Sequence, residues 1–273
     1  MNIKNFLLII LLGMNLTATA QHFHKNPVIA HRGAWKNTGH PENSLASFKA
    51  AADMGCHGSE FDVWFTAEDS MVVYHDSKRN GKLIEETSFA ELRSQRLKNG
   101  EKLPTLDEYL AFALKQKKTK LIIDIKTFVK NPERTVKLAL AIHKRIMHLG
   151  AASQTEYLAG YIPAILALQR ITDIPVAYLG KWRQEMPECY PAQMRLNGIK
   201  FADFQDERYL GHPDWAQQFK KDKVHLNVWT VDKDEDIRYF LHEGFNYITT
   251  NEPERVLQLY KQNRRTYDKA ARF

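Results

Sequence analysis

Short apolar segments alternate with amphipathic ones along this chain, and the alternation restricts the possible fold more than any other feature. The apolar segments have the length of strands, and the intervening ones carry the spacing of about 3.6 residues that is typical of helices. Strands that alternate with helices in this way form parallel βαβ units. The predicted strands are 27–32, 58–66, 71–75, 120–126, 155–160, 175–180, 198–204, 224–231 and 246–250.

The helical segments begin with recognisable signals. Thr105 and Glu108 have the spacing of a capping box, and Pro132 stands at a first helical position. The predicted helices are 43–54, 105–117, 132–149, 162–171, 206–221, 234–243 and 253–263, and segment 184–196 is left unassigned.

Strands 58–66 and 71–75 are separated by four residues, so we interpret the second as a hairpin-like extension of the first. Eight β/α units then remain, which is the count and the length of a TIM barrel. The predicted fold class is therefore α/β, a (β/α)8 TIM barrel, and a doubly wound open sheet is the alternative.

The N-terminal segment has the features of a secretory signal. A positive start at Lys4 precedes the apolar run 6–12, and the small residues Ala18 and Ala20 frame a cleavage site. The run is shorter than the roughly 20 apolar residues that span a bilayer. We predict a signal peptide over 1–20, a single domain over 21–273, export to the periplasm or the medium, and no stable membrane insertion.

The formal net charge of +7 does not by itself indicate a nucleic-acid partner. The basic residues are dispersed apart from 115–118 and 261–265, and we interpret them as a solvated surface with no nucleic-acid partner. Two cysteines, Cys56 and Cys189, are too few for a disulfide framework. Their pairing and the oligomeric state stay open.

Polar residues follow the apolar strands at the end where a TIM barrel carries its chemistry. His31 and Arg32 end the first strand, and Gly33 predicts the turn that follows. His75 comes directly after the apolar run of the third predicted strand, in the sequence MVVYHD at 71–76.

Carboxylates occur on two other predicted strands, 58–66 and 120–126. Glu60 and Asp62 are two residues apart and share one strand face, and so do Asp124 and Lys126. Two carboxylates on one buried face repel each other unless a cation lies between them. Each pair alone is compatible with a structural role, but together with the histidines they predict one site.

The residue types point to one chemistry. Three carboxylates are hard oxygen ligands that suit Ca²⁺ or Mg²⁺ rather than zinc. Arg32 and Lys126 would form a cationic cradle for a phosphate. His31 and His75 can serve as acid and base near neutral pH. A divalent metal ion, two positively charged side chains and an acid–base pair together predict cleavage of a phosphoester.

Several motifs carry a family resemblance. They are HRG at 31–33, PENS at 41–44, GSEFDVWFTAEDSMVVYHD at 58–76, IDIK at 123–126, LNVWTVD at 226–232 and GFNYITTNEP at 244–253. In these motifs the chain resembles the glycerophosphodiester phosphodiesterase family, in order, from residue 28 to about residue 256. The resemblance implies a TIM barrel that hydrolyses small glycerophosphodiesters to glycerol 3-phosphate and an alcohol.

The resemblance also implies residue roles, with one divalent cation as cofactor. They are His31 and His75 as the catalytic pair, Glu60, Asp62 and Asp124 as metal ligands, Arg32 and Lys126 as phosphate ligands, Trp229 in the pocket wall and Glu42 in a supporting role.

Three departures from the family pattern bear on the predictions. Asp124 stands where the family usually has glutamate, and its shorter arm favours Ca²⁺ over Mg²⁺, which tolerates irregular coordination poorly. The polar segment 77–103 is short, so we expect little discrimination among alcohol groups. Asn251 stands where aspartate is common, and we expect it to alter only the turn after the last strand.

Two other functions stay open. The sphingomyelinase D-type enzymes also have aspartate followed by lysine two residues later, so a lipid-cleaving phospholipase or sphingomyelinase D-like enzyme is the first alternative. A barrel that binds phosphate ligands without turnover is the second, and the intact histidine pair argues against it.

Overall fold

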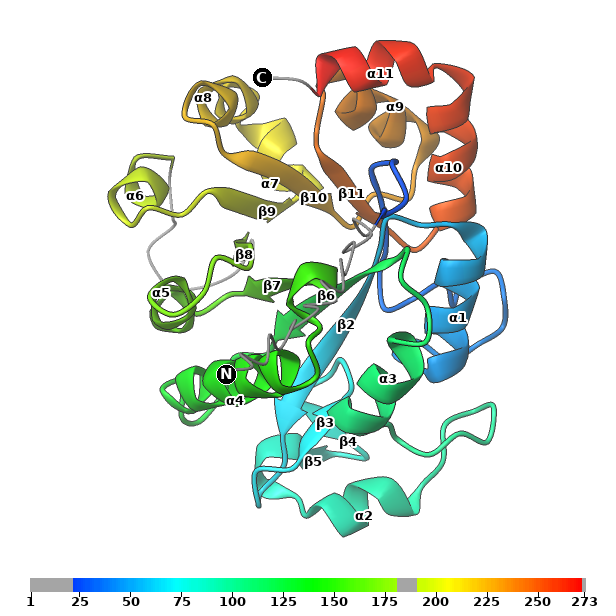
Figure 1. The fold of residues 1–273 in the computed structure, drawn as a ribbon, viewed down its shortest axis with the longest axis vertical. Coiled ribbons are helices and arrows are strands. Elements are labelled where there is room, and N and C mark those ends of the chain that lie inside the picture. The colour runs from blue at the N-terminus through cyan, green and yellow to red at the C-terminus, as the bar shows by residue number, and fades with distance from the viewer. Residues whose placement is uncertain (1–21, 181–190, 272–273) are drawn as a thin grey trace, which may run out of the picture.

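The computed structural model describes residues 22–180 and 191–271, and the predicted signal peptide and Cys189 lie outside these ranges. Eight parallel strands form a closed barrel, because β1 pairs with β2 on one side and with β11 on the other. Figure 1 shows the strands around one axis with helices outside them, which confirms the predicted (β/α)8 barrel. The barrel strands are β1 (Val28–Ala30), β2 (Gly58–Phe65), β6 (Lys120–Ile125), β7 (Thr155–Ala159), β8 (Val176–Gly180), β9 (Phe201–Gln205), β10 (His225–Trp229) and β11 (Tyr247–Thr250).

The outer helices bury one face each against the barrel. In α4 the residues Leu138, Ile142 and Ile146 recur every four positions, and all three are fully buried. Replacing one such side chain by alanine typically costs about 2–5 kcal/mol. The helices are α1 (Leu45–Met54), α3 (Leu106–Ala113), α4 (Arg134–His148), α5 (Ile162–Gln169), α6 (Pro191–Leu196), α7 (Asp206–Gly211), α8 (Asp214–Lys221), α9 (Asp234–His242), α10 (Pro253–Gln262) and α11 (Arg264–Ala270).

The barrel interior changes from apolar to polar along the axis. Near the N-terminal ends of the strands, Ile29, Ile122, Leu158 and Ala177 form a small buried cluster. Side chains two residues apart on a strand share a face, so the next inward residue after Ile122 is Asp124. The polar side chains therefore lie above a closed apolar floor, at the C-terminal ends.

The strand β3 (Met71–Val73) is the predicted hairpin extension, since it pairs antiparallel with the end of β2. Segment 77–103, expected to be a short polar connection, has structure of its own. It contains the hairpin β4 (Lys78–Arg79) and β5 (Lys82–Leu83), the 3₁₀ turn η1 (Ile84–Glu86) and the helix α2 (Phe89–Ser94). Its buried apolar residues Ile84, Leu92 and Leu103 anchor it to the barrel.

The helix predicted over 206–221 is two helices, α7 and α8, and this expectation was wrong. His212 has φ −135° and ψ 68°, outside the helical region. It precedes Pro213, whose ring disfavours the helical conformation in the residue before it. The helix α11 was not predicted, because its sequence reads as a basic tail. The assigned part of segment 184–196 is α6.

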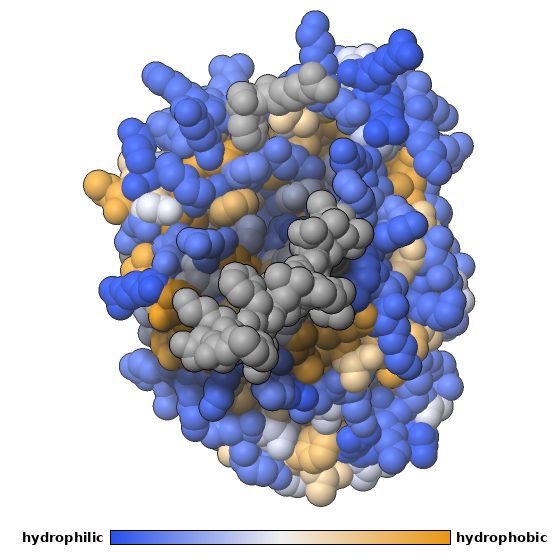
Figure 2. Space-filling view, viewed as in Figure 1, coloured by the Kyte–Doolittle hydropathy of each residue, from blue (hydrophilic) through white to orange (hydrophobic). Residues whose placement is uncertain are grey.

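Figure 2 shows a face that is mainly hydrophilic, with hydrophobic patches between the charged side chains. None of the helices that the structure describes combines the length and the apolar character needed to cross a membrane. Cys56 is buried in the core as a free thiol.

Candidate active site

A cavity of about 60 Å³ opens among the C-terminal ends of the barrel strands. Eight of the nine residues predicted for the site line it: His31, Arg32, Glu60, Asp62, His75, Asp124, Lys126 and Trp229. The ninth, Glu42, lies beside the cavity and contacts it through Arg32. The structure therefore brings the separate sequence motifs together at one place.

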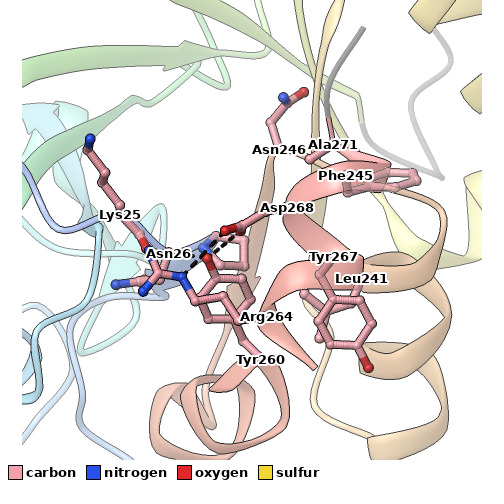
Figure 3. A pocket seen from close by; sticks show the side chains of 11 residues that line it. Lys25, Asn26, Leu241, Phe245, Asn246, Tyr260, Arg264, Tyr267, Asp268 and Ala271 are labelled. Atoms are coloured by element: carbon pink, nitrogen blue, oxygen red, sulfur yellow. Dashed lines mark hydrogen bonds and ion pairs between the residues drawn. The ribbon is translucent and has the colours of Figure 1, made fainter. Parts of the chain in front are cut away.

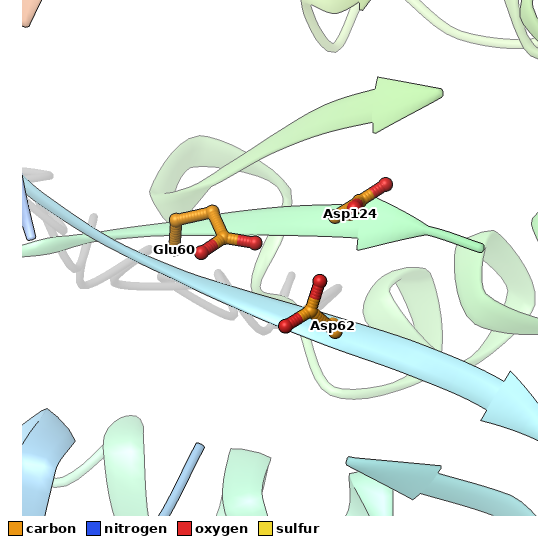
Figure 4. A group of neighbouring side chains, drawn as sticks. All are labelled: Glu60, Asp62 and Asp124. Carbon is orange, nitrogen blue, oxygen red and sulfur yellow. The ribbon is translucent and has the colours of Figure 1, made fainter. Parts of the chain in front are cut away.

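The three carboxylates meet because of strand register. Glu60 and Asp62 face inward from β2, and Asp124 lies directly opposite Asp62 on the neighbouring strand β6. One carboxylate oxygen from each of the three residues lies within 4.8 Å of the others. Figure 4 shows the three side chains on these two adjacent strands.

Lys126 holds two of these carboxylates. Its Nζ donates to Asp62 Oδ1 at 2.8 Å and to Asp124 Oδ2 at 2.9 Å, and all three side chains are buried. Burial lowers the pKa of Lys126, but the charges of Asp124 and Asp62 outweigh burial and raise that pKa. Asn43 Nδ2 donates to Asp62 Oδ2 at 2.7 Å.

The two carboxylates on β2 have opposite pKa shifts. For Asp62, burial favours the protonated form, but Lys126, His75 and Arg32 together outweigh burial and hold the pKa well below its usual range. For Glu60, burial and the negative charges of Asp62 and Asp124 raise the pKa well above its usual value. Burial and the neighbouring carboxylates thus make Glu60 the member of the cluster that most favours its protonated form.

These residues fit a hard divalent cation. The donors are carboxylate oxygens, which Ca²⁺ and Mg²⁺ prefer, and one oxygen from each of the three buried residues lies within 4.8 Å of the others. Glu60, Asp62 and Asp124 are the residues that would hold the ion.

A left-handed turn at the end of β1 positions Arg32. Arg32 and Gly33 have φ of 56° and 80°. The turn points the Arg32 backbone N–H at Glu60 Oε2, at 2.8 Å. A Cβ on Gly33 would lie 2.5 Å from Ser47 Oγ and 2.6 Å from its backbone carbon, so only glycine fits. Arg32 Nη1 donates to Glu42 Oε2 at 2.7 Å, which gives Glu42 its supporting contact.

Asn251 fixes the His31 ring. Its backbone N and Nδ2 donate to the two carboxylate oxygens of Asp232 at 2.8 and 2.9 Å, so its Oδ1 must face His31. That oxygen lies 2.8 Å from His31 Nδ1, which is therefore the protonated nitrogen, and Nε2 is left as an acceptor. Burial lowers the pKa of His31 to about 4. The ring is neutral at pH 7.

This contact corrects the expectation for Asn251. The sequence predicted a change confined to the turn after the last strand, but the side chain touches the predicted catalytic histidine. Asp232 ends the motif LNVWTVD, and Asn251 lies in ITTNEP. Nothing in either motif indicates that the two side chains are in contact.

His75 reaches the cavity because β3 runs antiparallel to β2. The chain turns back toward the cavity after β2, and Tyr74 N donates to the Asp62 carbonyl at 3.1 Å. His75 Nδ1 lies 2.8 Å from Asp76 Oδ1, and about a third of the side chain is exposed. The two histidines thus enter from two different loops.

The other half of the cavity is less charged. It is lined by Leu158, Leu179, Asp203, Thr249 and Trp229, from strands β7 to β11. Sequence reasoning missed Asp203, whose only signal is an acidic residue in the middle of a short apolar strand, FADFQ.

A larger cavity of about 290 Å³ lies at the opposite end of the barrel, beside the chain that enters β1. Figure 3 shows Tyr260, Arg264 and Asp268 there, with the carboxylate of Asp268 bonded to both neighbours. Asp268 is satisfied by these two neighbours, and the residues that line the cavity offer no acid–base pair beside a metal-ligand set. The small cavity is therefore the candidate active site.

The fold and the site together define a (β/α)8-barrel enzyme that acts on phosphoesters at the C-terminal ends of its strands. The glycerophosphoryl diester phosphodiesterase family model matches residues 31–255, and the chain belongs to this family of phosphoric diester hydrolases.

Individual relatives agree with this assignment. A glycerophosphodiester phosphodiesterase of Caldanaerobacter subterraneus is 29% identical over 258 residues, which cover 87% of this chain and 99% of that one. The crystal structure of a glycerophosphodiester phosphodiesterase from Parabacteroides distasonis is 34% identical, with a TM-score of 0.81 over 89% of this chain and 99% of that one. An Oleispira antarctica phosphodiesterase, solved with the product sn-glycerol-3-phosphate, shares the fold at 17% identity, with a TM-score of 0.72 over 86% of this chain and 97% of that one.

Proposed function

We propose that this chain is an exported, metal-dependent phosphodiesterase that hydrolyses glycerophosphodiesters to glycerol 3-phosphate and an alcohol. The observation that carries the proposal is the meeting of three buried carboxylates, two cations and two histidines in one cavity. The Oleispira neighbour, which holds sn-glycerol-3-phosphate on the same fold, supports the choice of substrate.

In the proposed mechanism, His31 is the general base. Its Nδ1 proton is held by Asn251, so Nε2 is free to take a proton from the nucleophile, which is a water molecule or the glycerol 2-hydroxyl. Water gives glycerol 3-phosphate directly, whereas attack by the 2-hydroxyl expels the alcohol and forms a cyclic phosphate that water then opens to glycerol 3-phosphate. His75 would give a proton to the leaving alkoxide. Its Nδ1 is held by Asp76, which leaves Nε2 for the substrate.

Two cations would bind the phosphate. Lys126 has three N–H donors and uses two on Asp62 and Asp124, so one remains for a phosphate oxygen. Among the described residues, the Arg32 side chain forms one hydrogen bond, with Glu42, so further guanidinium donors remain for the phosphate. A divalent cation on the three carboxylates would add positive charge where the pentacoordinate phosphorus accumulates negative charge.

The short arm of Asp124 favours Ca²⁺ over Mg²⁺. Aspartate is one methylene shorter than the glutamate that is usual in the family. Ca²⁺ accepts longer and less regular coordination than Mg²⁺, so the shorter arm suits the larger ion better.

Incubation with deacylated phospholipids of different head groups, and with the corresponding intact lipids, tests the function. Ca²⁺ or Mg²⁺ is added after chelation. We expect glycerol 3-phosphate from every deacylated substrate, with less than about 100-fold preference among head groups. Faster cleavage of intact lipids would favour the lipid-cleaving alternative, and binding of every substrate without product would favour the non-catalytic barrel.

Export rests on the N-terminal segment alone. Its positive start, apolar run and small-residue site predict cleavage before Gln21. N-terminal sequencing of the protein from the periplasm or the medium should begin at Gln21. A cytoplasmic protein that begins at Met1 would contradict this.

A further inference from the structure

We propose that Asp203 is a substrate-binding residue that holds a hydroxyl group of the glycerol end of the substrate. The inference rests on the proposed function and adds the orientation of the substrate in the cavity. It assigns the buried half of the cavity to glycerol and the mouth to the alcohol that leaves.

Asp203 is placed in the cavity by its strand. It faces inward from the middle of β9 and lines the cavity on the side opposite the strands that carry the carboxylate cluster. Trp229 Nε1 donates to the Asp203 backbone carbonyl at 3.0 Å, which ties the two cavity residues together. The backbone of Asp203 is therefore tied to the neighbouring wall residue, and the strand β9 directs its side chain inward.

One oxygen of the Asp203 carboxyl group lacks a partner within the described chain, while the group also has a side-chain hydrogen bond with Asn227. Asp203 is 1% exposed, and its Oδ1 makes no hydrogen bond to any residue that the structure describes. A buried polar atom without a partner is unfavourable, and such atoms in native proteins commonly mark a ligand site. The remaining polar neighbour in this half, Thr249, already exchanges hydrogen bonds with Asn227.

The chemistry of Asp203 suits a neutral hydroxyl. It is not one of the three residues whose oxygens converge within 4.8 Å, so it stands apart from the metal ligands. Burial, and after it the negative charge of Asp124, raises its pKa well above the usual value. Protonated or ionised, a carboxyl group accepts a hydrogen bond from a hydroxyl.

The two halves of the cavity orient the substrate. The phosphate belongs beside Arg32 and Lys126, so one of its two ester groups must lie on the side of Asp203. The cavity is only about 60 Å³, and Leu158 and Leu179 close it. We therefore place the smaller ester group, glycerol, on this side and the leaving alcohol at the mouth.

The test is calorimetric binding to the metal-loaded protein. The probes are glycerol 3-phosphate, the two propanediol phosphates that each lack one of its hydroxyls, and inorganic phosphate. The variants are Asp203→Leu, which keeps the shape and removes the polar atoms, and Asp203→Asn, which keeps a hydrogen-bonding group. Asp53→Leu, at an exposed carboxylate on α1, is the control.

We expect Asp203→Leu to weaken the binding of glycerol 3-phosphate about tenfold and to leave the binding of inorganic phosphate unchanged. Asp203→Asn and Asp53→Leu should stay within about threefold of the unaltered protein. One propanediol phosphate should bind the unaltered protein about tenfold more weakly than glycerol 3-phosphate, and Asp203→Leu should abolish that difference.

The proposal is overturned if Asp203→Leu binds glycerol 3-phosphate with normal affinity, or if its affinity for inorganic phosphate falls as much as its affinity for glycerol 3-phosphate. It is also overturned if Asp203→Leu keeps the full difference in affinity between glycerol 3-phosphate and the propanediol phosphate. If Asp203→Leu does not fold, Asp203→Ala takes its place in the same comparison. Failure of the proposed function is recognised separately, because the unaltered protein would then neither cleave glycerophosphodiesters nor bind glycerol 3-phosphate.

Discussion

Replacing Lys126 by methionine tests how the carboxylate cluster is held together. The ammonium group lies 2.8 Å from Asp62 Oδ1 and 2.9 Å from Asp124 Oδ2, at a buried position. Methionine keeps the apolar stem and removes the charge. Two buried carboxylates then lose their common cation while Glu60 stays beside them.

The expected cost is large. Removing one partner of a buried ion pair typically destabilises a protein by about 3–5 kcal/mol, because the remaining charge stays buried. For a domain of this size each kcal/mol lowers Tm by about 2–4 °C, so the metal-free variant should melt roughly 6–20 °C below the unaltered protein. A divalent cation on the same carboxylates should offset much of this loss.

Thermal unfolding with chelator, with Ca²⁺ and with Mg²⁺ measures both effects. Lys120→Met is the matched control, since Lys120 lies on the same strand and pairs with Glu156 at 2.9 Å, at the other end of the barrel. Lys120→Met should lose less stability, and metal should raise its Tm no more than that of the unaltered protein.

Equal losses for the two lysine variants in chelator would refute the account of the cluster. So would a Lys126→Met protein whose Tm rises with metal no more than that of the unaltered protein. Either result would mean that the carboxylates do not depend on a cation between them.

Three further predictions concern catalysis. His31→Ala and His75→Ala should each fold normally and lose about 10²-fold or more in kcat, and near-normal turnover would remove that histidine from the mechanism. Asn251→Asp places a negative charge beside His31 and should raise the pKa of its ring, so the limb of the pH–rate profile that His31 sets should move to higher pH; an unchanged profile, or an unchanged His31 titration by NMR, would contradict this. Asp124→Glu should narrow the difference between Ca²⁺ and Mg²⁺ in restoring activity after chelation, and an unchanged difference would contradict the argument from arm length.

The barrel itself was predictable because its signals are local. All eight residues of β2 are buried, as expected for a parallel strand covered on both sides, and the apolar run GSEFDVWF identifies it. The rule that barrel chemistry lies at the C-terminal ends of the strands then predicts, from the sequence alone, that Glu60, Asp62 and Asp124 lie close together. Elements with a weaker pattern, such as α2 and α11, were missed because little of their surface is buried.

The contacts within the site were harder to predict, since they join residues far apart in sequence. The contact between His31 and Asn251 spans 220 positions and depends on β1 and β11 being neighbours in the closed barrel. Asn43 reaches Asp62 only because it also takes a left-handed conformation, φ 58°, after the turn. Asp203 carried no motif at all, and only its inward position on β9 places it in the cavity.

The central claim is that this cavity cleaves the ester bond between glycerol 3-phosphate and its alcohol. Phosphorus NMR of glycerophosphocholine incubated with the metal-loaded protein tests it most directly, with His31→Ala as the control. We predict that the glycerol 3-phosphate signal grows as the substrate disappears, and that chelator and His31→Ala each prevent this. A phosphocholine signal in its place, or undiminished turnover in chelator, would contradict the account.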